Sequence, residues 1–236
     1  MLKALNCFNV EIKEDNHMPA KLAIVAQKGG PGKSTITRAL GVAYSSAGFK
    51  THLVDLDAGQ TSTAKWFERR SLAAAELGRP ELIDNLTCSW ARTLATAEAA
   101  IPASAEIVVY DGAPHATQQT VSLAQSANLV VIPTGISVDD LTPAITLALD
   151  LQNNHGIQPA TIAMVLNRVG DSDKELEEVA ALIREHLPDI HVIAASIPER
   201  KAYRSAQDSG FAIQEVTYPS LKQRATSVVE ALGELL

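Results

Sequence analysis

The feature that most constrains this chain is a glycine-rich loop between an apolar run and a segment with helical periodicity. Residues 23–26 are apolar, residues 27–32 read Gln-Lys-Gly-Gly-Pro-Gly, and Lys33-Ser34-Thr35 open the helical segment. This order predicts a buried strand, a phosphate-binding loop and a helix N-terminus. Glycines let successive backbone N–H groups face an anion, and the helix adds its own free N–H groups. A flexible linker of this composition is not expected between a buried strand and a helix, so the loop predicts nucleotide binding.

Individual residues of this loop have distinct expected roles. The usual phosphate-loop pattern has glycine where this chain has Gln27, and a second lysine, Lys28, follows it. Lys33 is expected to reach the β- and γ-phosphates, and the Ser34 hydroxyl to ligate Mg²⁺. ATP and Mg²⁺ are therefore the expected cofactors. The residues predicted to bind the nucleotide here are Gly29, Gly30, Pro31, Gly32, Lys33, Ser34 and Thr35.

Composition narrows the class of protein. The chain has 236 residues, 46% of them hydrophobic, which suits one large α/β domain with a sizeable core. Its net charge of −7 argues against a generally basic nucleic-acid binder but leaves room for a local basic patch. Cys7 and Cys88 form neither a metal-binding spacing nor a disulfide framework, which favours a reduced, intracellular compartment. No apolar run has the length of a membrane span.

Apolar, β-branched runs alternate along the chain with segments of helical periodicity. Strands are predicted at His52–Asp57, Leu82-Ile83, Ile107–Asp111, Leu129–Pro133, Ile162–Asn167 and His191–Ala195. Helices are predicted after the loop, from Thr61 to about Leu77, from Ser89 to Ala100, from about Asp139 to Asn153, and at the C-terminus. The last helix should bury Leu221, Ala225, Val228, Val229 and Leu232.

This alternation predicts an α/β fold with a mostly parallel central sheet and helices on both faces. We expect a single domain over residues 21–236, preceded by an extension over residues 1–20 that is either disordered or an edge strand. Met18 is an alternative natural start of the chain. Ligands of such sheets bind at the carboxyl ends of the strands, where the loop and several polar residues fall.

Two aspartates at strand ends are candidates for phosphoryl-transfer chemistry. Asp57 precedes an Ala-Gly-Gln turn and is expected to orient the attacking water and contribute to the metal site. Asp111 follows four apolar residues, as a Walker B carboxylate does, and should hold Mg²⁺ together with Ser34. The alternative for either aspartate is a helix cap or a plain loop carboxylate. Asp55 is expected to give structural support.

Three segments carry a family resemblance. Lys28–Thr35, Val54–Asp57 and Val108–Pro114 resemble the deviant Walker A, switch I and Walker B/switch II motifs of the ParA/MinD ATPases, which are P-loop NTPases. The similarity runs from about residue 20 to the C-terminus. It is strongest to short ParA-type partition proteins without an N-terminal helix-turn-helix domain. Gly112-Ala113-Pro114-His115 departs from the commoner Asp-Thr-Pro-Pro of that family.

The resemblance implies roles for further residues. In that family two subunits sandwich two ATP molecules, so Lys28 would reach the partner's nucleotide and stabilise transition-state charge. Asn167 would read adenine, and Pro198 would lie in the second base-side loop. ParA proteins in the ATP-bound dimer bind DNA without sequence preference through C-terminal basic residues, with ordinary surface charge as the alternative. The candidates here are Arg200, Lys201, Arg204, Lys222 and Arg224.

These features together predict a weak, Mg-dependent ATPase that acts as an ATP-dependent dimerising switch for DNA partition or cargo positioning. A ParB-like adaptor would stimulate hydrolysis, and the protein would be cytoplasmic and nucleoid-associated. A MinD-like membrane-cycling ATPase is one alternative, disfavoured because Glu230 and Glu234 lie in the last helix. A metabolic ligase on the same fold is another. An electron carrier of the nitrogenase-reductase kind would need cysteines at strand ends. The cargo stays open.

Overall fold

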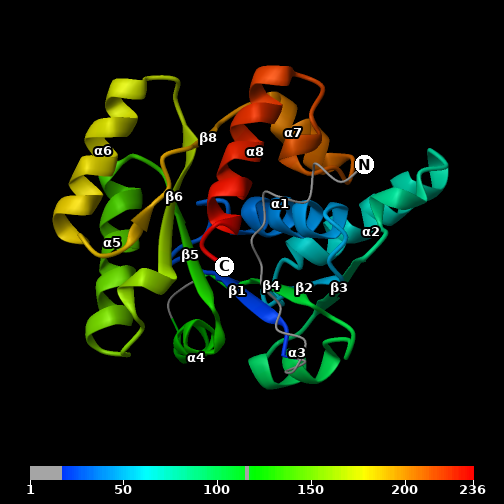
Figure 1. Ribbon diagram of the computed structural model, residues 1–236, viewed down its shortest axis with the longest axis horizontal. Coiled ribbons are helices and arrows are strands. Elements are labelled where there is room, and N and C mark those ends of the chain that lie inside the picture. Colours follow the sequence, from blue (N-terminus) through cyan, green and yellow to red (C-terminus); the bar gives the residue numbers. More distant parts are fainter. Residues whose placement is uncertain (1–17, 115–116) are drawn as a thin grey trace.

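A central parallel sheet organises the computed structural model, which describes residues 18–114 and 117–236 (Figure 1). Its strands are β1 (Ala20–Ile24), β2 (Thr51–Asp55), β3 (Leu86–Trp90), β4 (Ile107–Asp111), β5 (Leu129–Thr134), β6 (Ile162–Val169), β7 (His191–Val192) and β8 (Ile197–Pro198). The α-helices are α1 (Lys33–Ser46), α2 (Ser62–Glu76), α3 (Leu94–Ala100), α4 (Gln118–Ser126), α5 (Val138–Asn153), α6 (Asp173–His186), α7 (Lys201–Asp208) and α8 (Pro219–Gly233).

The strand order explains how distant residues meet at one edge. It is β3-β2-β4-β1-β5-β6-β7, with β8 paired to β6, and neighbouring strands run parallel. β1 therefore lies near the middle of the sheet, and the loop that follows it opens at the shared carboxyl edge. In the register of the ladders, Asp111 is opposite Ile24 on one side and Asp55 on the other.

Helices cover both faces of the sheet, as the sequence predicts. The core on one face joins the sheet to α1, α2, α7 and α8, and the core on the other joins it to α3, α4, α5 and α6 (Figure 1). The central strands β1, β4 and β5 are apolar almost throughout because both of their faces are buried. The predicted α/β fold class is confirmed.

Two predictions around the edge strand are wrong. Leu82 closes a 3₁₀-helix (Pro80–Leu82), and the strand lies at Leu86–Trp90, where its last two residues overlap the start of the helix predicted from Ser89. β3 has one open edge and a half-exposed, hydroxyl-rich sequence, so it lacks the apolar run that marks the buried strands. The helix itself starts at Leu94, where the Thr93 side chain accepts the N–H of Thr96 at 3.2 Å.

Predictions for the first and last parts of the chain are met in part. β1 begins at Ala20, and the part of the predicted extension in residues 1–17 lies outside the described residues. The last strand is shorter than predicted, at His191–Val192, and β8 and α7 were not foreseen. α8 buries Ala225, Val228, Val229 and Leu232 as expected, whereas Leu221 is only partly buried. Within residues 18–114 and 117–236, no helix has the length and apolarity needed to cross a membrane.

Candidate nucleotide-binding site

The glycine-rich loop, residues 27–32, connects the central strand β1 to α1. Gly30 and Gly32 have φ values of 97° and 102°, a region that favours glycine because a Cβ would crowd the backbone there. A Cβ on Gly32 would also lie 1.8 Å from Nδ2 of Asn167. The loop is thus a tight cradle at the N-terminus of a fourteen-residue helix, where free N–H groups and the helix dipole favour an anion.

Lys33, the first residue of α1, is a buried cation. Its side chain donates to the backbone carbonyl of Lys28 at 3.3 Å, across the mouth of the loop. Burial lowers the pKa of this ammonium, and the negative charges of Asp111 and Asp57 oppose that effect. A partly desolvated cation gains from an incoming phosphate, which suits the role predicted for Lys33.

Asp111, at the end of β4, forms the buried acidic side of the site. Its carboxylate accepts hydrogen bonds from the hydroxyls of Thr63, at 2.6 Å, and of Ser34. Burial, helped by the charge of Asp55, raises the pKa of Asp111 to about 6. A hydroxyl beside a buried carboxylate is an oxygen donor pair that suits Mg²⁺, so Ser34 and Asp111 fit the predicted metal site. Among the described residues, no cluster of three or more His, Cys, Asp or Glu side chains could hold a metal ion.

The two aspartates near the end of β2 differ in what they contact. The Asp55 carboxylate accepts the backbone N–H groups of Asp57, Thr63 and Ala64 at 2.7–3.1 Å, which fastens the start of α2 to the sheet. Asp57 accepts the N–H groups of Gly59 and Gln60 and stays partly exposed. The structure thus gives Asp55 a supporting position and places Asp57 in a turn. The negative charge of Asp57 acts to raise the pKa of Lys33.

A cavity of about 240 Å³ lies on the other side of the loop. Asn167 and Pro198, the two predicted base-side residues, line it together with Gly32 and Thr35. The Asn167 amide donates to the carbonyl of Pro31 at 2.5 Å. Arg168 and Glu199 also line this cavity, and neither was singled out from the sequence. A charged residue directly after the polar end of a buried strand is the signal that marks Arg168.

The side chain of Lys28 contacts the start of α5. Its Nζ lies 2.6 Å from the Asp140 carboxylate and donates to the carbonyl of Asp139 at 2.9 Å. The ion pair lowers the pKa of Asp140. The side chain of Lys28 is 40% exposed, so this lysine lies at the surface of the site rather than inside it.

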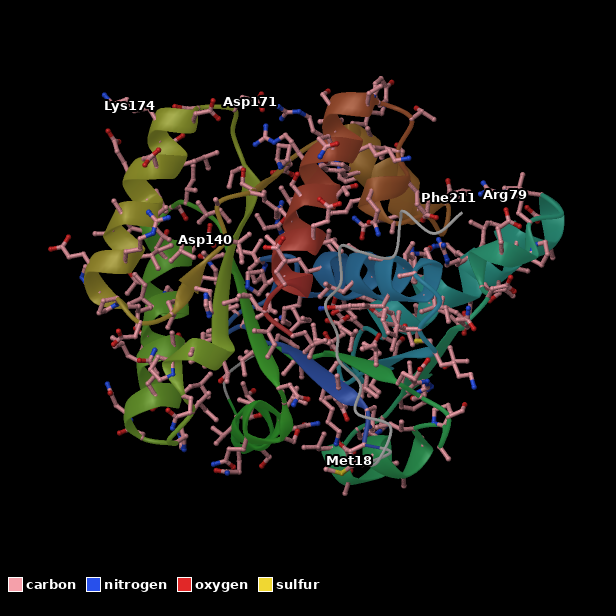
Figure 2. The ribbon with its side chains drawn as sticks, in the orientation of Figure 1. Met18, Arg79, Asp140, Asp171, Lys174 and Phe211 are labelled. Atoms are coloured by element: carbon pink, nitrogen blue, oxygen red, sulfur yellow. The ribbon has the colours of Figure 1, made fainter. Side chains whose placement is uncertain are left out.

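Most of the predicted DNA-binding residues lie close together beside the cavity. Asp171, which lies in the loop between β6 and α6 (Figure 2), forms ion pairs with both Arg200 and Arg224. Arg204 lies 3.5 Å from Glu199. Lys201 and Lys222 are exposed. The start of α7 and the first turns of α8 thus form one surface with positive side chains, several of them neutralised by acids of the same chain.

Several known structures share this fold. Apo McdA from Cyanothece is 21% identical, with a TM-score of 0.68 over 91% of this chain and 100% of that chain. MinD from Pyrococcus horikoshii with Mg-ADP is 20% identical, with a TM-score of 0.65 over 91% and 95%. A putative plasmid partition protein from Borrelia burgdorferi bound to AMPPNP is 16% identical, with a TM-score of 0.65 over 91% and 98%.

Sequence comparison assigns the chain more directly. No relative was found among curated protein sequences. A family model does match, over residues 22–211, which include the loop, all the strand ends described above and the start of α7. The chain therefore belongs to the CobQ/CobB/MinD/ParA nucleotide-binding domain family.

Proposed function

We propose that this protein is an ATP-dependent dimerising switch ATPase that positions DNA or another cargo by binding nonspecific DNA in its ATP-bound state. The observation that carries the proposal is that predicted base-side residues and predicted DNA-binding residues line one cavity. Asn167 and Pro198, the predicted base-side residues, line the same cavity as Arg200 and Arg204, two of the predicted DNA-binding residues. A nucleotide entering that cavity would lie next to the basic surface, so its presence can change how that surface is arranged.

The residues of the site divide the work of binding. Gly29, Gly30, Pro31, Gly32 and Thr35 would surround the phosphates, and Lys33 would supply the buried countercharge. Ser34 and Asp111, with Asp57 nearby, would hold Mg²⁺. When bound, Mg²⁺ and ATP supply a transferable phosphoryl group and charge compensation for its transfer. Asp57, in its exposed turn, would orient water.

The position of Lys28 supports a role between two subunits. This lysine is partly exposed at the surface of the site, and it would reach the nucleotide of a second subunit, giving a weak ATPase until the dimer forms. MinD from Aquifex aeolicus was solved in complex with MinC, a precedent for an adaptor protein. By analogy, a ParB-like or centromere-binding adaptor would stimulate hydrolysis here and release the dimer from DNA.

Binding to nonspecific duplex DNA tests the proposal. We expect binding with a slowly hydrolysed ATP analogue and Mg²⁺, none with ADP or without nucleotide, and an affinity that falls steeply with salt. Arg204→Ala should reduce the slope of log affinity against log salt by about 1 per lost phosphate contact. Lys174→Ala, on the acidic helix α6, is the matched control. Equal binding in all nucleotide states, or in none, would contradict the DNA-based switch.

A further inference from the structure

The end of β6 presents two successive side chains to the same loop. In a regular strand Asn167 and Arg168 would point to opposite faces of the sheet. Instead, Asn167 donates to the carbonyl of Pro31 at 2.5 Å and Arg168 Nη1 donates to the carbonyl of Gly30 at 3.1 Å. Consecutive residues of the strand therefore hold consecutive carbonyls of the phosphate loop.

An irregularity of the strand makes this double contact possible. The register between β6 and β8, which lie side by side (Figure 1), shifts between Asn167 and Val169. Arg168 lies within that shift and has a φ of 59°, in the left-handed region that a residue with a Cβ seldom adopts. A bulge re-aims a side chain, and an unfavourable backbone conformation maintained at a ligand site points to function.

The two hydrogen bonds fix how the loop presents its donors. In a trans peptide the carbonyl and the following N–H point in opposite directions. Holding the Pro31 carbonyl against Asn167 therefore turns the N–H of Gly32 away from the Asn167 side chain. The preceding peptide ends in Pro31, which has no N–H to offer an anion. Its carbonyl, that of Gly30, is consequently free to serve as an anchor, and Arg168 uses it.

Arg168 is itself held from the opposite side. Its Nη2 lies 3.2 Å from Oε1 of Glu199, while its side chain remains 54% exposed along the cavity wall. The planar guanidinium can serve both partners at once because its donors form a rigid fork. We propose that Arg168 is a positioning residue that holds the phosphate loop in its binding-competent shape. The inference deepens the nucleotide site proposed above and rests on it.

Preorganisation predicts how binding should change. Loss of the guanidinium leaves the loop to be ordered by the ligand, so Arg168→Ala should weaken Mg²⁺-dependent binding of a fluorescent ADP analogue about tenfold. The loss should be the same for ADP and ATP, because the loop holds the phosphates common to both. Arg168→Lys, which can reach one partner but not both, should recover part of the affinity. Arg168→Gly should lose as much as Arg168→Ala while relieving the left-handed backbone.

Inorganic pyrophosphate separates positioning from direct contact with the nucleotide. Used as a competitor of the fluorescent ADP analogue, it should bind Arg168→Ala more weakly by the same factor, because it needs the loop but has no base. An unchanged pyrophosphate affinity would place Arg168 on the base, and a loss confined to ATP would place it on the γ-phosphate. Either result overturns the proposal.

Control measurements distinguish a failure of the role proposed for Arg168 from a failure of the proposed nucleotide site. Lys174→Ala removes one positive charge from an exposed helix position and should leave nucleotide affinity unchanged. Wild-type protein that binds no ADP or ATP would refute the proposed function. If the wild type binds and both Arg168→Ala and Arg168→Gly bind with wild-type affinity, only the role of Arg168 is refuted. The pair also guards against misfolding, since the glycine variant does not carry the backbone strain.

Discussion

The Nζ of Lys28 lies 2.6 Å from the carboxylate of Asp140, so the first lysine of the loop is paired with α5 of its own chain. The Asp140 carboxylate also accepts the Ser137 hydroxyl at 2.8 Å, which holds it at the start of that helix. Both ends of the ion pair are partly exposed. Such a pair contributes little stability, about 0–1 kcal/mol, and can be exchanged for another anion at low cost.

Replacing Lys28 tests whether this lysine acts between subunits. Lys28→Ala should bind ATP with nearly wild-type affinity, since Lys33 remains, but should fail to dimerise or to reach the stimulated rate of hydrolysis. Light scattering with a slowly hydrolysed ATP analogue and phosphate release with DNA and adaptor present are the measurements. Normal dimerisation and turnover would remove the role in trans. Lys65→Ala, another exposed lysine, which donates to the carbonyl of Gln60, is the control.

Replacing Lys33 should separate stability from binding. Burial lowers the pKa of this lysine, which means that its charge is poorly solvated in the folded protein. Lys33→Met should therefore unfold at a higher temperature than wild type without nucleotide, while losing ATP binding. Thermal unfolding with and without Mg-ATP measures both effects. Retained ATP affinity would contradict the assignment of the site, and a lower unfolding temperature would contradict the account of its charge.

The architecture could be predicted because it depends on strong local patterns. Buried parallel strands such as Ile107–Asp111 and Leu129–Thr134 are apolar up to a polar last residue and follow helical segments, so their order along the chain could be predicted. β3 was not, because a half-exposed edge strand has no such run. The strand predicted at Leu82-Ile83 was wrong because two adjacent apolar residues shortly after a proline fit a strand or a 3₁₀ turn equally well.

Which side chains gather at the candidate site could be predicted from the sequence, whereas their contacts could not, and their roles stay predictions. The spacing around Lys33 and the aspartates at strand ends indicated which side chains meet. The sequence could not indicate that Arg168 takes a left-handed conformation, because that depends on the register of β8. It also could not indicate that Asp171 pairs with arginines 29 and 53 residues away. Such pairings depend on tertiary packing, which charge patterns along the chain do not encode.

The raised pKa of Asp111 predicts a pH-dependent stability. Its value is about 6 in the folded protein, mainly because of burial, against about 4 when unfolded, so the folded state binds this proton more tightly. The free energy of unfolding should then decrease as pH rises from about 4 to 7, by about 3 kcal/mol at most. Asp111→Asn keeps a partner for Thr63 and should flatten this decrease. Urea unfolding across that pH range in EDTA tests it. An equal slope in both proteins would assign the effect elsewhere, for example to Asp55, whose pKa burial also raises.

Asp171 should limit DNA binding, because its carboxylate forms ion pairs with two of the arginines proposed to contact phosphates. Arg200 and Arg224 both form ion pairs with it, so a DNA phosphate must displace a carboxylate of the same chain. Asp171→Asn should raise the affinity of the ATP-bound state for nonspecific duplex DNA several-fold at constant salt. Asp173→Asn removes the same charge two residues away, and its smaller gain measures the general electrostatic effect. Equal gains in the two variants would show that the ion pairs themselves do not compete with DNA.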